Sequence, residues 1–146
     1  MGLDRLVKLD ISYTPITELG SMPHLTTLVA RGCRLQRIPP SVTDLDLSHT
    51  PSPVDLRGTR IRYLKIAGAD CAISEQHITG LNLVKLDIDD NRLIEQISLP
   101  DLRTLRAGGS SALTQESLNR CTDLEVLYVR DNPNITSSPP CHQGES

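Results

Sequence analysis

The sequence has very few aromatic residues. Its 146 residues include three tyrosines but no tryptophan and no phenylalanine. A core without large rings must be built from aliphatic side chains, and such a core suits many small repeated layers better than one assembly packed around rings. The length of 146 residues is that of one domain, large enough to bury such a core without staples. The scarcity of aromatic residues therefore favours a repetitive fold.

Long apolar runs, a basic surplus and a signal peptide are also lacking. No apolar stretch approaches the roughly 20 residues of a membrane-spanning helix. The first residues, Met1–Arg5, do not show the basic-then-apolar order of a signal peptide. The net charge of −3 gives no sign of a nucleic-acid or membrane-surface partner. We therefore expect a soluble, cytoplasmic chain without nucleic-acid or membrane partners, or a piece cut from a larger protein.

Residues that could support catalysis or bind a metal are present but are not grouped. The four cysteines form no CxxC pair and are expected to be free thiols; they are Cys33, Cys71, Cys121 and Cys141. The histidines, which are His24, His49, His77 and His142, are scattered along the chain, so no nucleophile–base pair is predicted. Asp87–Asn91 begins like a calcium-binding loop, but Arg92 and Ser98 replace the glycine and glutamate that this loop requires. We predict no catalytic residue, no cofactor and no metal site.

One nine-residue pattern organises the chain. It has apolar residues at its first, fourth and sixth places, as Leu83–Asn91 (LVKLDIDDN) illustrates. The pattern occurs seven times, with its first place at Leu6, Leu25, Val42, Ile61, Leu83, Leu102 and Leu124. The intervals between copies are 19, 17, 19, 22, 19 and 22 residues. The fourth place is leucine in every copy, which is far beyond chance: Leu9, Leu28, Leu45, Leu64, Leu86, Leu105 and Leu127.

The pattern predicts a short strand and a bend in each copy. Places four and six point the same way, as alternate residues of a strand do, and the regular return places successive strands parallel and side by side. At the ninth place a side chain can turn inward and bond backbone groups that the bend leaves free. The ninth places are Thr14, Cys33, Thr50, Ala69, Asn91, Ser110 and Asn132. Because Ala69 has no polar side-chain atom, we expect water or backbone to take this role there.

The pattern resembles that of the leucine-rich repeat family, LxxLxLxxN/C/TxL, over about residues 6 to 135. The short, Thr-rich, irregular copies are similar to those of protozoan or bacterial leucine-rich repeat proteins. The eleventh place fits less well, since Ser52, Cys71, Ala112 and Asn134 are small or polar. The resemblance implies an α/β fold: a right-handed leucine-rich repeat solenoid with a concave parallel sheet of about seven strands and a convex side of extended segments or short helices. We assign residues 1–135 to this domain and 136–146 to an extended or mobile tail.

The return segments are expected to differ with their length. The two 22-residue copies have room for a helical turn, and each has an N-cap residue flanked by two apolar residues that can contact one another. These trios are Ile73, Ser74 and Ile78 in the fourth copy and Leu113, Thr114 and Leu118 in the sixth. The second copy returns through Ile38–Pro40 and the third contains Pro51 and Pro53, so both segments should be extended.

Candidate binding residues lie on the concave face, which we define as the surface formed by the third, fifth and seventh places. The fifth places alternate in charge on strands ~4.8 Å apart, from Asp46 through Lys65 and Asp87 to Arg106. The predicted protein-binding residues are Asp46, Tyr63, Lys65, Asp87, Asp89, Arg106, Tyr128 and Arg130. Tyrosine and arginine are frequent interface anchors. Alternatively, the row of charges satisfies itself as exposed ion pairs, worth only ~0–1 kcal/mol each. Gly108 and Gly109 leave a gap that either admits a partner side chain or eases the bend.

The resemblance implies a noncatalytic module that presents its concave face to a protein or peptide partner. Two alternatives remain open. The chain could be the substrate-recruiting part of a larger ubiquitin-ligase or phosphatase-regulator assembly, or a structural solenoid segment of a cytoskeletal or cell-surface protein. Neither end has the polar cap that a solenoid needs, which favours a fragment of a longer protein over an end that a partner covers.

Overall fold

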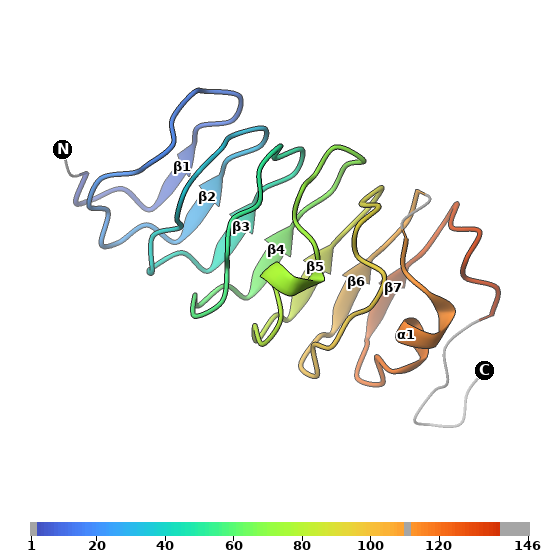
Figure 1. Cartoon of the computed structure of the whole chain (residues 1–146). Helices are drawn as coiled ribbons and strands as arrows, with labels where there is room; N and C mark the ends of the chain where they lie inside the picture. The colour runs from blue at the N-terminus through green and yellow to red at the C-terminus, as the bar shows by residue number, and fades with distance from the viewer. Residues whose placement is uncertain (1–2, 110–111, 138–146) are drawn as a thin grey trace.

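A single parallel sheet dominates the computed structural model, which describes residues 3–109 and 112–137. Its strands are β1 (Lys8–Asp10), β2 (Thr27–Val29), β3 (Asp44–Asp46), β4 (Tyr63–Lys65), β5 (Lys85–Asp87), β6 (Thr104–Arg106) and β7 (Val126–Tyr128). They pair in sequence order, and every pair is parallel. Figure 1 shows the strands side by side, with a return segment leading from each strand to the next. The predicted solenoid of seven parallel strands is confirmed.

The fourth-place leucines align across the whole sheet. Each is the register partner of the fourth-place leucine on the next strand. The five inner leucines, on β2 to β6, are at most 3% exposed, whereas Leu9 and Leu127 at the two ends are only partly buried. A one-residue slip would turn these side chains out of the core, so their burial fixes the register.

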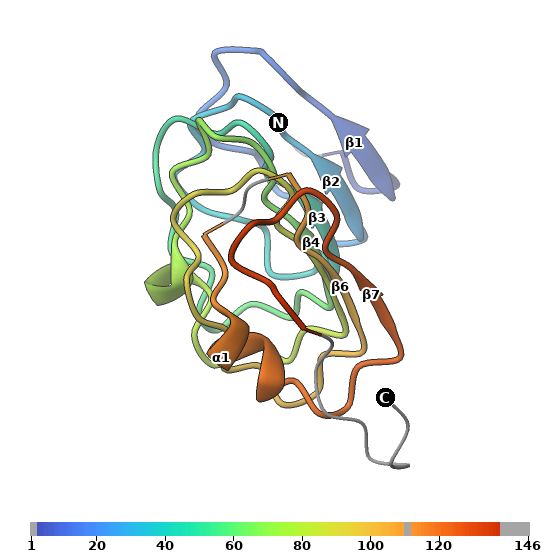
Figure 2. The ribbon, with the colours of Figure 1, turned by 90° about the vertical axis from the view of Figure 1, so that its right-hand side faces the viewer.

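The core lies between the sheet and the return segments. In the view along the solenoid, the strands form one side and the returns form the other (Figure 2). Sixth-place residues such as Leu47, Ile66 and Ile88 fill the space together with return-segment residues such as Leu56 and Ile94, all 1% exposed or less. The core is aliphatic, as the scarcity of aromatic residues predicts.

Two return segments contain a helical turn, and both were predicted from their caps. The 3₁₀ turn η1 (Glu75–His77) follows Ser74, whose backbone N–H donates to His77 Nδ1 at 3.0 Å. The helix α1 (Gln115–Asn119) follows Thr114, whose hydroxyl accepts the N–H of Ser117 at 3.1 Å. Both turns lie on the side away from the sheet (Figure 2). The apolar residues that flank the two caps, Ile73, Ile78, Leu113 and Leu118, are all buried.

Of the other sequence predictions, one is confirmed and several fall on residues that the structure does not describe. Ile38–Pro40 and residues 51–53 contain no helix, as predicted. Among the described residues, no helix is long and apolar enough to cross a membrane. Ser110, the Cys141-His142 pair and residues 138–146 of the predicted tail lie outside the described residues, so the boundary at residue 135 remains a prediction.

The asparagines at the ninth place bond the backbone of the preceding repeat. Asn91 Nδ2 donates to Ile66 O at 2.9 Å, and Asn132 Nδ2 donates to Ala107 O at 3.1 Å. The expectation for Ala69 is wrong, because this bend is two residues longer and brings Cys71 into the equivalent position. The Cys71 thiol donates to Leu47 O at 3.7 Å, as the Cys33 thiol donates to Ile11 O at 3.0 Å.

The eighth place has a left-handed backbone in all seven repeats. The side-chain-bearing residues there are Tyr13, His49, Asp90 and Asp131, and the glycines are Gly32, Gly68 and Gly109, all with positive φ. The two kinds alternate along the chain, and each glycine accommodates the side chain of the preceding repeat. A Cβ on Gly32 would lie 2.6 Å from the Tyr13 ring, and one on Gly68 would lie 2.6 Å from His49 Nδ1. The structural unit is therefore a pair of repeats.

Candidate functional site

The concave face contains two hollows that share one residue, Arg106. A hollow of about 680 Å³ crosses β2 to β6, and Asp46, Tyr63, Lys65 and Asp87 are among the residues that line it. A second hollow, of about 440 Å³, lies where the last strands end and is lined by the remaining predicted residues, Asp89, Tyr128 and Arg130. The fold thus brings all eight predicted binding residues to the concave face. Gly108 and Gly109 line the second hollow.

The alternating charges of the fifth places lie in register but form only part of a ladder. Asp46, Lys65, Asp87 and Arg106 are successive register partners. Arg106 Nε lies 3.5 Å from Asp87 Oδ2 and 3.6 Å from Asp89 Oδ2. Asp46 pairs instead with Arg31, at 2.7 Å. Among the described residues, Lys65 has no carboxylate within ion-pair distance.

Asp87 does not face solvent as predicted: the residue is only 8% exposed. It lies between Lys65 and Arg106 on the neighbouring strands, and the long stems of such side chains can cover a shorter one. Burial raises the pKa of Asp87, and the charge of Asp89 adds to this rise, while Lys65 and Arg106 lower the pKa. Asp87 is therefore part of the structure beneath the face rather than a group exposed for contact.

The aspartates at fifth places have a structural role in three repeats. Asp10, Asp46 and Asp87 each accept the backbone N–H of the residue two positions later, at 2.9, 3.0 and 3.0 Å. This short-range bond is typical of aspartate, and it satisfies an N–H where the strand bends. The signal was present in the sequence as Asp-x-Ser and Asp-x-Asp triplets, but the charge pattern drew attention to binding instead.

Seventh-place side chains in the same three repeats satisfy the next repeat. Ser12 Oγ accepts the N–H of Arg31 at 3.1 Å, and Ser48 Oγ accepts that of Ala67 at 3.1 Å. Asp89 Oδ1 accepts the N–H of Gly108 at 2.8 Å. Asp46, Asp87 and Asp89 are thus all engaged in backbone bonds, which weakens their assignment as contact residues.

The seventh repeat departs from this arrangement. Tyr128 and Arg130 occupy the places that hold aspartate and serine or aspartate in the first, third and fifth repeats. Arginine has no acceptor atom, so Arg130 cannot take over the backbone bonds of Ser48 or Asp89. Tyr128 is 47% exposed, and its ring centroid lies 4.7 Å from Arg106 Cζ. Tyr128 and Arg130 are exposed on the concave face and lack the role of accepting backbone N–H groups that their counterparts have.

Beside the two tyrosines, two further exposed residues were not among the predicted set. Val126 is 39% exposed on β7, and Lys85 is exposed on β5 beside Tyr63, its register partner on β4. Tyr63 is 47% exposed. The third-place rule that identified Tyr63 applies equally to Lys85 and Val126, so the sequence contained the signal for both. The two tyrosines of the concave face therefore have exposed basic and apolar neighbours.

Side chains that could bind a metal ion are not grouped within the described residues. No group of three His, Cys, Asp or Glu side chains could hold a metal ion in that part of the chain. His49 Nδ1 lies 2.7 Å from Asp70 Oδ1, but both side chains are largely exposed. Cys33, Cys71 and Cys121 are free thiols, and burial raises the pKa of both Cys71 and Cys121, which disfavours their reactive thiolate forms.

Comparison with known proteins returned no match. No family model, no curated protein and no solved structure matches this chain.

Proposed function

We propose that the chain is a leucine-rich repeat solenoid of the α/β class, with a right-handed superhelix, and that it acts as a noncatalytic protein-interaction module. The observations that support the family assignment are the leucine at every fourth place, the inward ninth-place side chains and the parallel strands in sequence order. In this proposal a protein or peptide binds the concave face.

The single observation that carries the binding proposal is the change of residue type in the seventh repeat. Where three earlier repeats use short acceptors to satisfy the backbone, this repeat exposes Tyr128 and Arg130. Tyrosine provides a large contact area at low conformational cost, and arginine provides a planar set of donors. Side chains of these types, exposed without the backbone role of their counterparts, are suited to contact a partner.

Binding would extend from this patch toward the centre of the sheet. Tyr128 contacts Arg106, which lines both hollows, and the larger hollow continues to Tyr63. An anchor at β7 with secondary contacts near β4 would span three strand spacings of ~4.8 Å each, a length suited to a short peptide or a loop of a protein.

Affinity capture from lysate with the double variant Tyr128→Ala/Arg130→Ala tests the proposal. The amount of partner captured by the variant should fall at least about tenfold, because one aromatic anchor and one charged contact are removed. A matched control is Arg92→Ala/Leu93→Ala, which removes one exposed arginine and one exposed apolar side chain outside the concave face. Equal capture by the wild type and Tyr128→Ala/Arg130→Ala would remove this patch from the proposal.

A further inference from the structure

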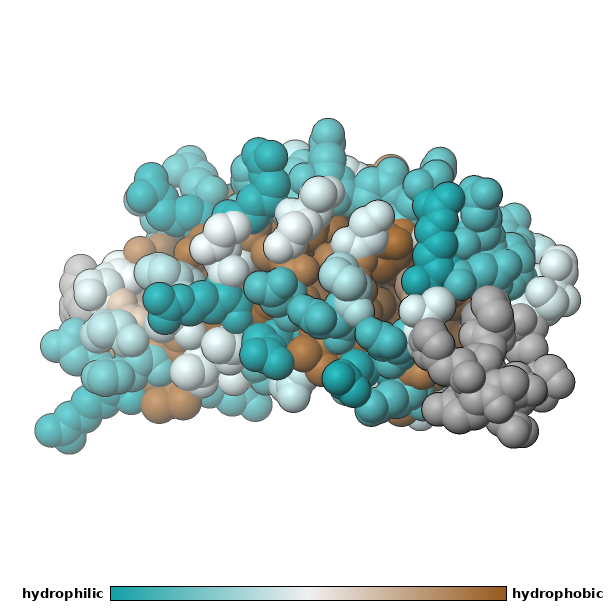
Figure 3. Space-filling view, turned by 90° about the horizontal axis from the view of Figure 1, so that it is seen from below, coloured by the Kyte–Doolittle hydropathy of each residue, from teal (hydrophilic) through white to brown (hydrophobic). Residues whose placement is uncertain are grey.

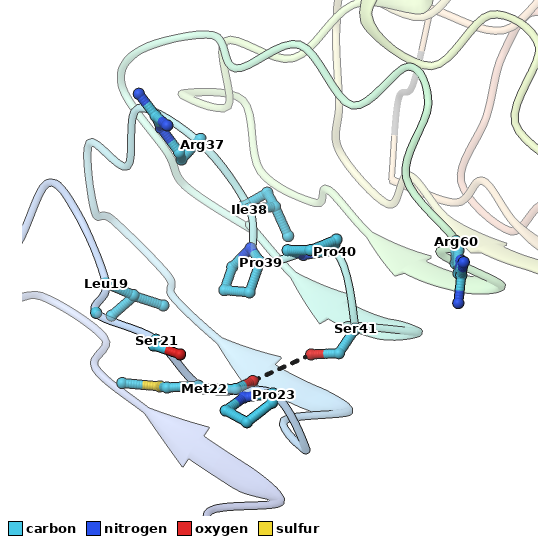
Figure 4. Close-up of a pocket in the computed structure, with 11 residues that line it drawn as sticks. Leu19, Ser21, Met22, Pro23, Arg37, Ile38, Pro39, Pro40, Ser41 and Arg60 are labelled. Atoms are coloured by element: carbon cyan, nitrogen blue, oxygen red, sulfur yellow. Dashed lines mark hydrogen bonds between the residues drawn. The ribbon is translucent and has the colours of Figure 1, made fainter. Parts of the chain in front are cut away.

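A third hollow lies outside the concave face, beside the turns that precede β2 and β3. It has a volume of about 650 Å³ and is lined mainly by apolar residues, among them Leu19, Met22, Pro23, Ile38, Pro39 and Pro40. Figure 4 shows these side chains on two neighbouring return segments, facing one another across the gap. Seen from below, the molecule also shows hydrophobic residues among hydrophilic ones (Figure 3).

The short second repeat accounts for this hollow. Its interval of 17 residues is two shorter than those of the repeats on either side. It returns through Ile38–Pro40 without a helical turn, so there is less chain to fill the space beside Met22 and Pro23. The Ser41 hydroxyl donates to Leu25 O at 2.6 Å and to Met22 O at 3.2 Å, which ties the two turns together.

The walls of the hollow are suited to an apolar ligand. Proline has no backbone N–H. A ligand that covers the three prolines therefore buries no unpaired N–H group of these residues. Their rings are rigid and lose little conformational freedom on binding. Met22 and Ile38 are buried, at 9% and 8% exposed, and line the hollow from the core side.

The charged residues at the hollow are both arginines. Arg37 and Arg60 line it together with the apolar residues, and no aspartate or glutamate does so. In Figure 4 the two arginines lie at opposite ends of the row formed by Ile38, Pro39 and Pro40, with Arg37 directed away from it. Neither arginine forms an ion pair within the part of the chain that the structure describes. The complementary ligand presents apolar side chains to the prolines and carries carboxylates that can reach the two arginines.

We propose that this hollow is a docking site for an extended acidic peptide segment whose apolar side chains lie against the prolines and whose carboxylates contact Arg37 and Arg60. This site is separate from the concave face, so a partner could occupy either without the other.

Fluorescence anisotropy with a labelled octapeptide that alternates leucine and glutamate tests the proposal. We expect saturable binding to the wild type, and binding at least about fivefold weaker to Arg37→Glu/Arg60→Glu, because two attractive rim contacts become repulsive. Peptides that alternate serine with glutamate, or leucine with lysine, should bind more weakly than the first peptide. The peptide should shift the backbone amide resonances of Met22, Ile38 and Ser41 in a titration followed by NMR.

Arg34→Glu/Arg92→Glu is the matched control, since it makes the same change of net charge at two exposed arginines away from the hollow. It should bind the leucine–glutamate peptide like the wild type. Equal weakening by both double variants, no saturation below about 1 mM peptide, or shifts confined to the concave face would overturn the proposal. Shifts of the same amides with protein concentration alone would also overturn it, because they would identify a second copy as the occupant. A negative result at this hollow leaves the proposal for Tyr128 and Arg130 standing, so the two proposals fail independently.

Discussion

The odd and even repeats have the same strand but different chemistry around it. The odd repeats, which begin at Leu6, Val42, Leu83 and Leu124, carry a side chain at the left-handed eighth place, and the even repeats carry glycine there. The first three odd repeats place aspartate at the fifth place, whereas the even ones have Val29, Lys65 and Arg106. The ninth place is Thr or Asn in odd repeats, whereas Cys33 and Cys71 take the inward position in the second and fourth repeats.

These differences form one arrangement of complementary parts. An odd repeat supplies acceptors to its own backbone and to that of the next repeat, and its eighth-place side chain covers the glycine of that repeat. The even repeat receives these groups, so its fifth place can be basic. The aspartates of the charge alternation thus have a backbone role. Fewer residues of the concave face therefore need a role in binding to explain them.

The largest difference should appear at the ninth place. Asn91 is fully buried; it donates to Ile66 O and Ile73 O and accepts the N–H groups of Leu93 and Ile94. Asn91→Ala should lower the free energy of unfolding by about 3 kcal/mol, because several buried partners lose their bonds. Cys71→Ala should cost only about 1 kcal/mol, since one weak thiol bond is lost. Urea denaturation measures both, and similar costs would show that the two kinds of repeat do not differ at this place.

The next effect concerns the eighth-place glycines. Gly68→Ala should cost about 2 kcal/mol, because its φ is positive and the new Cβ would meet the His49 ring at 2.6 Å. Gly58 is a matched control, with φ of +83° and nothing within 4 Å of an added Cβ, and Gly58→Ala should cost about 1 kcal/mol. Thermal or urea unfolding of the pair isolates the contact between repeats. Equal losses would mean that the odd side chain does not require a glycine beside it.

A smaller effect is expected at the helix cap of an even repeat, where the longer return leaves room for α1. Thr114→Ala should lower the free energy of unfolding by about 1 kcal/mol, because the N–H of Ser117 loses its acceptor. Thr114→Ser retains the hydroxyl and should remain within about 0.5 kcal/mol of the wild type. If both variants behave alike, the cap does not stabilise this return segment.

The smallest effect should be a pH dependence at Asp87. Because burial raises its pKa above the ordinary value of 3.8, protonation favours the folded state. Its contribution to stability is full below that ordinary value and is lost as the pH rises through the folded-state pKa. The Asp87→Asn variant carries no titratable side chain at this position. The free energy of unfolding of this variant should therefore increase relative to that of the wild type as the pH rises. Unfolding curves from about pH 3 to about pH 6 measure this difference, and a constant difference would contradict the burial.

The repetitive fold could be predicted from the sequence because one residue type at one place determines it. A leucine at every fourth place sets the strand, its inward face and its register, and the caps at Ser74 and Thr114 locate the two helical turns. The bend at Cys71 was missed because two additional residues precede it, and counting from the first place puts Ala69 at the ninth. Spacing alone cannot show which of two nearby residues turns inward.

The candidate site was only partly predictable, since position on a face does not reveal what a side chain bonds. The register brings Asp46, Asp87 and Asp89 to the concave face, as expected, but each accepts a backbone N–H. The Asp-x-Ser and Asp-x-Asp triplets signal the bonds between residues two positions apart, whereas the bonds between neighbouring repeats become visible only in three dimensions. Comparing the same places across the odd repeats is what separates Tyr128 and Arg130 from the structural residues.

The most direct test of the account compares the same two places in the third and seventh repeats. The measurement is the free energy of unfolding of Asp46→Ala/Ser48→Ala and of Tyr128→Ala/Arg130→Ala, each relative to the wild type, by urea denaturation. The first pair should lose about 3 kcal/mol, because two backbone N–H groups lose their acceptors and Arg31 loses its partner. The second pair should lose less than about 1 kcal/mol, since it removes mainly the contact with Arg106. Equal losses, or a larger loss in the seventh repeat, would contradict the claim that these places are structural in the odd repeats and released for binding at the last strand.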